Sequence, residues 1–357
     1  MLGQKLLLLA SAVVAVTSAV ADAALPVFFF HGSTGNHTNG DNIGTLLKAK
    51  GHSYVALDFC EKACSVQTSL SDQVQLAIKQ VRNIVSKSPA TYANGYHFLA
   101  HSQGGVIARG VVEEMDDHKV HTLVSLAGDG NGNFYGPQAS DLTTPIQVLL
   151  QALGPFALTT SEFDFSKYDA SSLKGKFQKD FTHFVLSRAD LQKKNAVVNT
   201  LFPPVVNSAT DFLSVNPFYP EINNLKNCGS DSTCTNNQKR RKTNFLKLKA
   251  YHLFASPADD IQSPWQTSLL GKYSELASVA EIETKFSSLK VLDAKNTEEY
   301  TKDLYGLKTL DQSGRLHLHQ VAGIGHNCWL FDYVPLGQTK ECKFQPNYLS
   351  NVAPVFV

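Results

Sequence analysis

The sequence has no excess of positive or negative charge. Its 357 residues include 32 Lys and Arg against 31 Asp and Glu, which gives a formal net charge of +1. A chain this close to neutrality has no overall field that would attract nucleic acid or an anionic membrane, and we expect neither as a partner. The one basic run, residues 239–242 (KRRK), lies in a polar stretch and is interpreted as a solvated loop or helix start.

Long apolar segments are also missing beyond the N-terminus. Residues 1–23 have the composition of a signal peptide, with Lys5 before an apolar core and small residues that allow cleavage after Ala21 or Ala23. The apolar core is interrupted and too short to span a bilayer comfortably, and no later segment could cross one. We therefore expect a soluble, monomeric protein of the secretory pathway, either lysosomal or extracellular, without a transmembrane anchor.

Cysteine spacing typical of a metal site is lacking as well. The six cysteines suit an oxidising compartment, where disulfides form, and six cysteines allow fifteen connectivities. We expect the local pairing, which joins Cys60 to Cys64, Cys228 to Cys234 and Cys328 to Cys342. Asn36 begins the only glycosylation sequon, Asn-His-Thr, and is the candidate glycosylation site.

Short apolar runs alternate with helical periodicity in the first third of the chain. Residues 71–86 carry apolar side chains three and four positions apart, as in an amphipathic helix, and a second helix is expected after Ser102. Strand–helix–strand alternation implies right-handed crossovers and a parallel sheet. The expected strands of this part cover residues 25–30, 53–58, 96–101 and 120–127.

The alternation stops between residues 133 and 244, and strands resume at 245–255 and 316–321. The interruption is typical of an insertion over the carboxyl edge of the sheet, where such sheets bind ligands. Its apolar residues pack into a cap core or line a groove, and the sequence leaves both open for Leu149, Leu150, Leu153, Phe156, Leu201, Phe202, Phe212 and Phe218. The expected organisation is a signal peptide (1–23), an N-terminal core (24–132), a lid (133–244), a C-terminal core (245–334) and a tail (335–357).

The residues around Ser102 have the pattern of a nucleophile elbow, a sharp strand-to-helix turn that raises a serine hydroxyl above the sheet. Small residues are needed around such a serine because its backbone is strained and the helix passes close to the strand. Gly104 and Gly105 satisfy this need, whereas Ala100 stands where the usual pattern has glycine. The alternative interpretation is a serine that only caps the helix.

Two backbone N–H groups are candidates for an oxyanion hole. The Gln103 N–H lies at the N-terminus of the expected helix, beside any negative charge that forms at Ser102. The second donor is expected in the loop after the first strand, residues 31–35 (HGSTG), from Ser33 or from Thr34. The alternative is an ordinary strand-to-helix turn.

Ser102, an aspartate at position 259 or 260, and His326 each follow the end of an expected strand, in the Ser–Asp–His order of α/β-hydrolases. A serine hydroxyl is a poor nucleophile until a base takes its proton, and the near-neutral pKa of histidine suits that role. The aspartate orients the imidazole. We favour Asp259 over Asp260, with Asp129 as an outside candidate.

Three other histidines are interpreted as structural. His317 and His319 alternate within an expected strand and therefore share one face of it. His101 precedes the serine and is expected to shape the elbow.

A set of motifs carries a family resemblance: His31-Gly32, residues 102–105 (SQGG), Asp259 six positions before Trp265, residues 300–307 (YTKDLYGL), residues 310–314 (LDQSG) and Gly325-His326. With these motifs the chain resembles the palmitoyl-protein thioesterase family over roughly residues 25–130 and 245–331. It is similar to the family's second branch in residues 264–268 (PWQTS), and Ala100 departs from the first branch's glycine. The insertion and the tail after Phe331 are unmatched.

The resemblance implies an α/β-hydrolase fold, with a mostly parallel sheet flanked by helices, a helical lid and an apolar groove for a long acyl chain. It implies hydrolysis of fatty acyl thioesters, on S-palmitoylated proteins or peptides or on acyl-coenzyme A, through an acyl-serine and without cofactor or metal. By carry-over, Ser102 is the nucleophile, Asp259 the acid and His326 the base, and the backbones of Ser33 and Gln103 form the oxyanion hole.

Other functions remain open. A secreted lipase or carboxylesterase would use the same triad on oxygen esters. A non-catalytic hydrolase-fold protein would keep the groove as an acyl or lipid carrier, and a secreted effector would act by surface contact.

Overall fold

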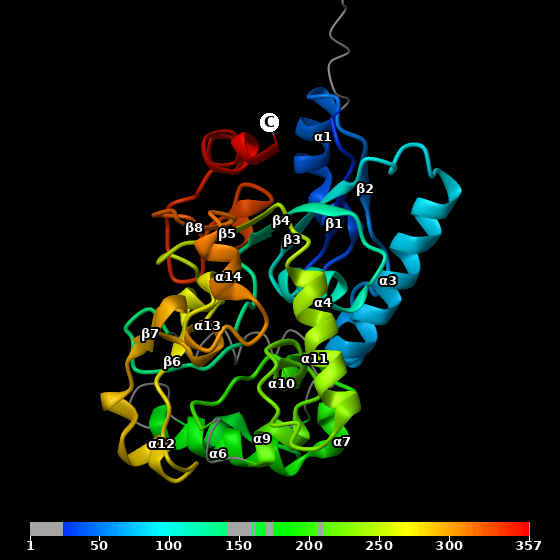
Figure 1. Ribbon diagram of the computed structural model, residues 1–357. Helices are drawn as coiled ribbons and strands as arrows, with labels where there is room; N and C mark the ends of the chain where they lie inside the picture. Colours follow the sequence, from blue (N-terminus) through cyan, green and yellow to red (C-terminus); the bar gives the residue numbers. More distant parts are fainter. Residues whose placement is uncertain (1–23, 142–158, 160, 169–173, 206–209, 357) are drawn as a thin grey trace, which may run out of the picture.

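The computed structural model describes residues 24–141, 159, 161–168, 174–205 and 210–356 (Figure 1). The expected signal peptide lies outside the described residues, as do Leu149, Leu150, Leu153 and Phe156 of the expected lid.

A six-stranded sheet forms the centre of the protein, in the order β2-β1-β3-β4-β5-β8. Every pairing in this sheet is parallel, which confirms the predicted α/β architecture. The strands are β1 (Val27–Phe30), β2 (Tyr54–Ala56), β3 (Tyr96–His101), β4 (Val120–Leu126), β5 (Ala250–Ala255) and β8 (Leu316–Gln320).

The central strands are apolar on both faces because helices or coil cover both. In β1 and β3 every residue is buried, and successive side chains point to opposite faces. Phe28 and Phe30 enter one core, whereas Phe29 joins Leu99 in a second core across the sheet. The Phe30 and Phe98 rings meet edge to face, with centroids 4.7 Å apart.

Three helices cover the first face: α3 (Leu70–Lys87), α4 (Gln103–Glu114) and α11 (Ser232–Phe245), with α4 packed between the other two. The expected strand over residues 245–255 is wrong in its first half. Helix α11 runs through Phe245, its chain turns over residues 246–249, and β5 begins only at Ala250. The last helix of the expected lid therefore flanks the sheet.

The C-terminal segment belongs to the second core. It comprises α15 (Phe344–Asn347), η8 (Tyr348–Val352) and η9 (Ala353–Phe356) and lies beside α1 (Asp41–Ala49) at the top of Figure 1. Phe344, Tyr348, Val352 and Phe356 are buried together with Phe29 and Trp329. The segment expected as a tail thus completes the packing of the sheet.

Short helices form a layer at the opposite end of the molecule (Figure 1). They bury an aromatic cluster that includes Phe177 and Phe181. The layer contains α6 (Lys174–Ser187), α7 (Ala189–Gln192), α8 (Ala196–Asn199), α9 (Thr210–Val215), α10 (Tyr219–Ile222) and α12 (Glu281–Thr284).

None of the helices in the described part of the chain is both long and apolar enough to cross a bilayer.

The remaining elements are small. These elements are η1 (His37–Gly40), α2 (Cys64–Gln67), η3 (Phe165–Lys167), η4 (Trp265–Leu269), the two-stranded antiparallel pair β6 (Lys272–Tyr273) and β7 (Val291–Leu292), η5 (Phe286–Ser288), η6 (Ala294–Asn296), α13 (Glu298–Thr301), α14 (Leu307–Gln312) and η7 (His326–Trp329).

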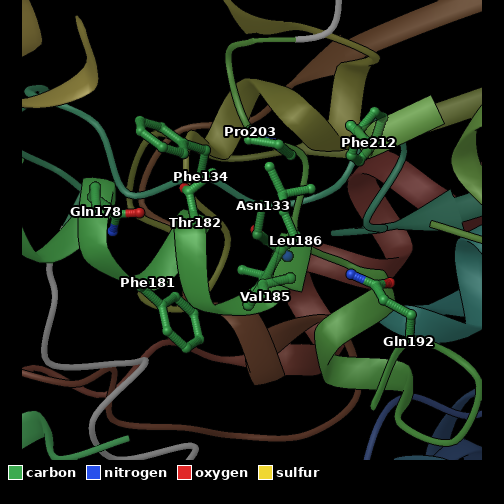
Figure 2. A pocket seen from close by; sticks show the side chains of 11 residues that line it. Asn133, Phe134, Gln178, Phe181, Thr182, Val185, Leu186, Gln192, Pro203 and Phe212 are labelled. Atoms are coloured by element: carbon green, nitrogen blue, oxygen red, sulfur yellow. The ribbon is translucent and has the colours of Figure 1, made fainter. Parts of the chain in front are cut away.

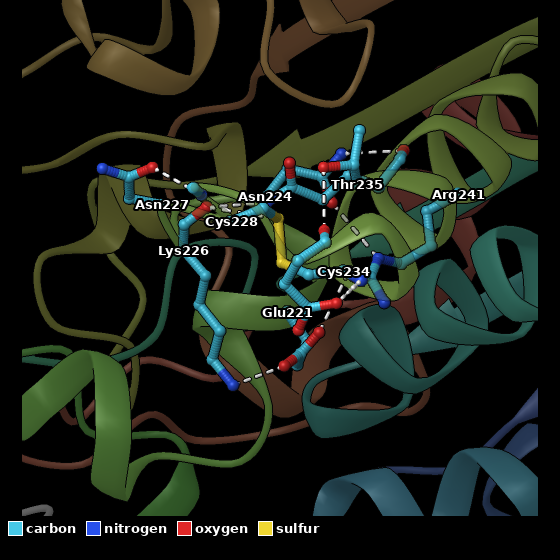
Figure 3. Close-up of a disulfide and its surroundings, with 11 residues drawn as sticks. Glu221, Asn224, Lys226, Asn227, Cys228, Cys234, Thr235 and Arg241 are labelled. Carbon is cyan, nitrogen blue, oxygen red and sulfur yellow. Dashed lines mark hydrogen bonds and ion pairs between the residues drawn. A yellow bond between two sulfur atoms is a disulfide. The ribbon is translucent and has the colours of Figure 1, made fainter.

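The basic run at 239–242 lies inside α11, so its interpretation as a solvated loop or helix start is wrong. The Arg241 guanidinium is buried and pairs with Glu221 at 2.9 Å and with Glu114 at 3.3 Å (Figure 3). Lys242 pairs with Asp303 at 2.8 Å. These ion pairs tie α11 to α4 and α10, which gives the run a structural role.

The structure contains the three local disulfides, Cys60–Cys64, Cys228–Cys234 and Cys328–Cys342. Figure 3 shows the second of them at the start of α11. The first lies at α2, close to the loop that follows β1, and the third joins η7 to the segment before α15.

Candidate active site

Ser102 occupies the sharp turn between β3 and α4. Its backbone has φ 56° and ψ −132°, a region that non-glycine residues rarely enter and that is costly to maintain. The turn is held because the Ser102 N–H donates to the Leu126 carbonyl at 3.0 Å and the Gly105 N–H donates to the Ser102 carbonyl at 2.8 Å. The Ser102 hydroxyl makes no capping bond to α4, so the helix-cap interpretation does not describe this serine.

Close backbone contacts explain the small residues of the elbow. A Cβ atom at Gly104 would lie 2.4 Å from the Phe30 carbonyl oxygen, because α4 starts directly against the end of β1. A Cβ atom at Gly32 would lie 2.9 Å from the Ser102 Cβ. The Ala100 methyl group, by contrast, is fully buried in the first core, where the extra carbon is accommodated.

His326 and Asp259 extend a line of hydrogen bonds from the serine. The His326 Nε2 lies 2.9 Å from the Ser102 hydroxyl oxygen, and its Nδ1 lies 3.1 Å from each Asp259 carboxylate oxygen. Asp259 follows β5 and also accepts the N–H groups of Ile261 and Gln262, each at 2.9 Å. Histidine and aspartate are both buried.

Asp260 has a different place. Its Oδ1 accepts the His326 N–H at 2.8 Å, and its Oδ2 accepts the Tyr333 hydroxyl at 2.8 Å and the Leu336 N–H at 2.6 Å. Asp260 therefore holds the backbone at His326 and makes no contact with the imidazole nitrogens. The structure brings Asp259, not Asp260, to the position of an orienting acid.

Electrostatics favour a charged aspartate beside the histidine. Burial acts to raise the pKa of Asp259, but His326 and the two backbone N–H groups outweigh it and leave the pKa below its usual value. Burial acts to lower the pKa of His326, but the Asp259 carboxylate outweighs it, so this pKa lies above the usual value. Asp260 and Asp129 add smaller contributions in the same direction.

His101 contacts the backbone of His326. Burial lowers its pKa to about 3, so the ring is neutral at working pH. Its Nε2 lies 2.9 Å from the His326 carbonyl oxygen, which requires the proton on that nitrogen. His101, which was expected to shape the elbow, therefore also holds the backbone at His326.

The Ser33 and Gln103 N–H groups have no hydrogen-bond partner among the described residues, and both residues line a pocket with Ser102. The Thr34 N–H donates to the Ser65 hydroxyl at 2.8 Å and is therefore occupied. Of the two donors that the sequence left open in this loop, Ser33 is the one that remains free.

Two residues that hold the Gln103 side chain, Ser65 and Gln73, were not anticipated from the sequence. The Gln103 side-chain amide donates to the Ser65 carbonyl at 3.0 Å and to the Gln73 side-chain oxygen at 3.1 Å. These contacts join the start of α4 to α2 and α3. Neither Ser65 nor Gln73 lies beside a recognisable motif. Only folding of the chain brings them to the turn at Ser102.

The histidines of β8 lie outside the site. His317 and His319 share a face of the sheet, as expected, and stack on His252 of β5 with centroid distances of 4.2 and 5.3 Å. The described residues contain no group of three or more His, Cys, Asp or Glu side chains that could hold a metal ion. The absence of a cofactor remains a prediction.

Two pockets meet at Ser102. One, of about 560 Å³, extends beneath the lid, and the other, of about 780 Å³, opens over the loop after β1. The lid pocket is largely apolar beyond its catalytic end, with Tyr135, Phe181, Val197, Leu201 and Ile261 in its walls. The second is more polar and includes Thr34, Asn36, Asn39 and Asn327.

A third pocket, of about 310 Å³, adjoins the lid pocket (Figure 2). Asn133, Phe181 and Leu201 line both, so the two pockets lie against each other at these residues. Leu201 thus lines the pocket, whereas Phe202 and Phe218 of the same insertion are core residues. Phe212 does both, because it is buried in the core and lines the third pocket.

The sequon residue Asn36 lies in the polar pocket. Its side-chain oxygen accepts the Thr38 N–H at 2.9 Å and the Thr38 hydroxyl at 2.6 Å. Any glycan on this residue would therefore stand beside the active site. Glycosylation remains a prediction.

Known proteins resemble the chain in sequence and in structure. Relatives include the lysosomal thioesterase PPT2-B of Xenopus laevis (26% identity, 66% of this chain and 64% of that protein) and human lysosomal thioesterase PPT2 (23%, 73% and 68%). The chain thus spans about two thirds of the length of these relatives. Palmitoyl-protein thioesterase 1 of Caenorhabditis elegans is 25% identical over 66% of this chain and 63% of that protein.

Among solved structures, a lipase-esterase related protein from Clostridium acetobutylicum aligns over 87% of this chain and 90% of that chain, with 11% identity and a TM-score of 0.36. The family model described as palmitoyl protein thioesterase matches residues 26–326, most of the sequence. The chain belongs to the palmitoyl protein thioesterase family.

Proposed function

We propose that this protein is a serine thioesterase that hydrolyses long-chain fatty acyl thioesters through an acyl-serine intermediate. Its substrates would be S-palmitoylated proteins or peptides, or acyl-coenzyme A. The observation that carries the proposal is the line of hydrogen bonds from Ser102 through His326 to Asp259, at the mouth of an apolar lid pocket. The thioesterase names of the relatives support it.

In the first half of the reaction, the Ser102 oxygen attacks the thioester carbonyl carbon and His326 Nε2 takes the hydroxyl proton. The Ser33 and Gln103 N–H groups stabilise the negative charge that forms on the carbonyl oxygen. The C–S bond then breaks, and the departing sulfur receives the proton from His326, which leaves the imidazole neutral for the second half. A thiol has a pKa of about 8.5 and leaves readily, so this step depends less on proton donation than the loss of an alkoxide would.

In the second half, water attacks the acyl-serine while His326 takes its proton. The same N–H groups stabilise the second oxyanion, and collapse releases the fatty acid and restores the Ser102 hydroxyl as His326 returns the proton. Asp259 stays ionised throughout and stabilises the imidazolium. We assign the acyl chain to the lid pocket and its continuation, and the thiol portion to the polar pocket.

We also propose a lysosomal destination within the secretory pathway. The relatives are named lysosomal thioesterases, and the three disulfides suit that route.

The direct test compares a palmitoyl thioester with the matched palmitoyl oxygen ester, using the purified protein. The proposal expects thiol release at a higher kcat/KM than alcohol release. Activity on the oxygen ester alone would instead establish a lipase or carboxylesterase. A folded protein that neither hydrolyses a substrate nor reacts with a serine-directed fluorophosphonate would be an acyl carrier.

The pH dependence of kcat/KM should report the histidine. Catalysis needs neutral His326, so kcat/KM should fall as pH decreases through the pKa of this residue in the free enzyme. Because Asp259 raises that pKa, the midpoint should lie above the usual value of about 6.5. A pH series on a thioester substrate measures it, and a midpoint clearly below 6.5 would contradict the assignment.

Replacing Leu201 by tryptophan should shorten the acyl path, because this residue lies where the lid pocket meets its continuation. Loss of contact with two methylene groups, each contributing about 0.8 kcal/mol, lowers kcat/KM for palmitoyl relative to butyryl thioesters by about tenfold. Leu201→Met, which nearly conserves volume, is the control and should retain the chain-length preference. An unchanged preference in Leu201→Trp would place the acyl chain elsewhere.

A further inference from the structure

Asp129 is a buried carboxyl group in the wall of the lid pocket. It follows β4 at the carboxyl edge of the sheet and is only 5% exposed, yet it lines the same pocket as Ser102. Its neighbours in that wall include Leu201, Ile261 and the ring of Tyr135, which offer apolar surface suited to an acyl chain. A carboxyl group is costly in such a wall unless something pairs with it.

The Asp129 carboxyl is not a second triad acid. Its Oδ1 accepts the Gln262 side-chain amide and lies 3.5 Å from the Asn133 amide nitrogen. Gln262 donates its backbone N–H to Asp259, so one residue fixes both carboxylates. The imidazole of His326 bonds to Asp259 and to Ser102, and not to Asp129.

The second oxygen of Asp129 is left unpaired. Among the described residues, no hydrogen bond reaches Oδ2, although the group is buried. Two neighbouring polar groups of this wall are already engaged: the Asn133 oxygen accepts the Ser263 N–H at 2.9 Å, and the Thr200 hydroxyl donates to the Val197 carbonyl at 2.8 Å. Asp129 Oδ2 is therefore a carboxyl oxygen of the wall that remains available to an acyl chain.

A chain of methylene groups alone would cover this oxygen and leave it without a partner, which opposes binding. A hydroxyl group on the chain would remove the conflict. It would donate to an ionised Asp129, and it would accept a hydrogen bond from a protonated one. Burial raises the pKa of Asp129 above its usual value, and a hydroxyl group can pair with either form of the carboxyl group.

We propose that Asp129 recognises a hydroxyl group close to the carbonyl of the acyl chain, so that hydroxyacyl thioesters are better substrates than unsubstituted ones. The position near the carbonyl follows because Ser102 and Asp129 face the same pocket at adjacent strand ends. This inference rests on the proposed thioesterase function and assigns a substrate class to it.

The test uses N-acetylcysteamine thioesters of decanoic, 2-hydroxydecanoic and 3-hydroxydecanoic acid, with each hydroxy acid in both configurations. Each ratio of kcat/KM, hydroxy over unsubstituted, is divided by the corresponding ratio of hydroxide-catalysed rates, which removes the inductive effect of the hydroxyl group. For the wild-type protein we expect one hydroxy isomer to be favoured by about tenfold or more, the range of a hydrogen bond to a charged group.

Asp129→Leu should reduce that ratio to about one, whereas Asp129→Asn, which can still bond to a hydroxyl group, should retain part of it. Thr200→Val is the matched control, since the Thr200 hydroxyl is already committed, and it should keep the wild-type ratio.

A corrected wild-type ratio near one for every isomer overturns the inference even if no variant folds, and so does a preference that survives in Asp129→Leu. Hydrolysis of decanoyl thioester without a hydroxyl preference would defeat this inference alone. No hydrolysis of any thioester would defeat the proposed function as well.

Discussion

Replacing Ser102 with alanine should lower kcat for thioester hydrolysis by about 10⁶-fold, the loss found when a triad nucleophile is removed. The variant keeps the fold, because the side chain makes no capping bond and its removal leaves the backbone contacts of the turn intact. The residual rate would come from the oxyanion donors and substrate binding. Progress curves of thiol release at high enzyme concentration, with unfolding curves beside them, provide the measurement.

Ser33→Ala is the informative companion, because Ser33 shares both pockets at the catalytic centre with Ser102. Its proposed role belongs to the backbone N–H, which the substitution keeps, so only a small fraction of the Ser102→Ala loss is expected. A loss at Ser33 as large as at Ser102 would contradict the assignment of the nucleophile.

Asp259→Asn should lower kcat by about 10⁴-fold, because an amide cannot hold the histidine in the required tautomer or stabilise its charged form. The remaining activity should have its acidic limb at lower pH, since the charge that raises the pKa of His326 is gone. Both quantities come from kcat and kcat/KM measured over a pH series.

Asp260→Asn separates this role from a structural one. Asp260 accepts hydrogen bonds from the His326 N–H, the Tyr333 hydroxyl and the Leu336 N–H, and an amide nitrogen would face at least one N–H donor. We expect lower stability, by about 1–3 kcal/mol, with a far smaller loss of kcat than at Asp259. The reverse order of the two kcat losses would exchange the roles of the two aspartates.

Strand ends made most of the site predictable from sequence. Ser102 directly follows β3, whereas the Asp259-Asp260 pair and His326 lie in the loops that follow β5 and β8; parallel strands bring such positions to one edge. Only the three-dimensional structure distinguishes the roles of the two aspartates. They are one peptide bond apart, and only the folded turn at 261–262 directs one carboxylate to the imidazole and the other to the loop backbone.

Features that depend on distant partners were not predictable in this way. Arg241 looked like a solvated charge because Glu114 and Glu221, which neutralise it, are far away in the sequence.

The C-terminal segment carried a usable pattern: buried aromatic and aliphatic residues at positions 344, 348, 352 and 356, four apart, as on one helical face. Expecting a tail there overlooked that periodicity.

Within the lid, neighbouring residues of one apolar stretch have different fates. Leu201 lines the lid pocket and Phe202 belongs to the core, although both are equally apolar in the sequence. Composition sets the apolar content of such a segment, but only tertiary packing decides which side chain meets substrate.

Trapping the covalent intermediate is the direct test of Ser102 as the nucleophile. The protein would be mixed with a palmitoyl thioester, quenched in acid within the first turnovers and digested for peptide mass analysis. We expect one palmitoyl group on the peptide that carries Ser102, formed as thiol is released and absent from Ser102→Ala. Palmitoyl groups on a different residue, or undiminished thioester hydrolysis by Ser102→Ala, would contradict it.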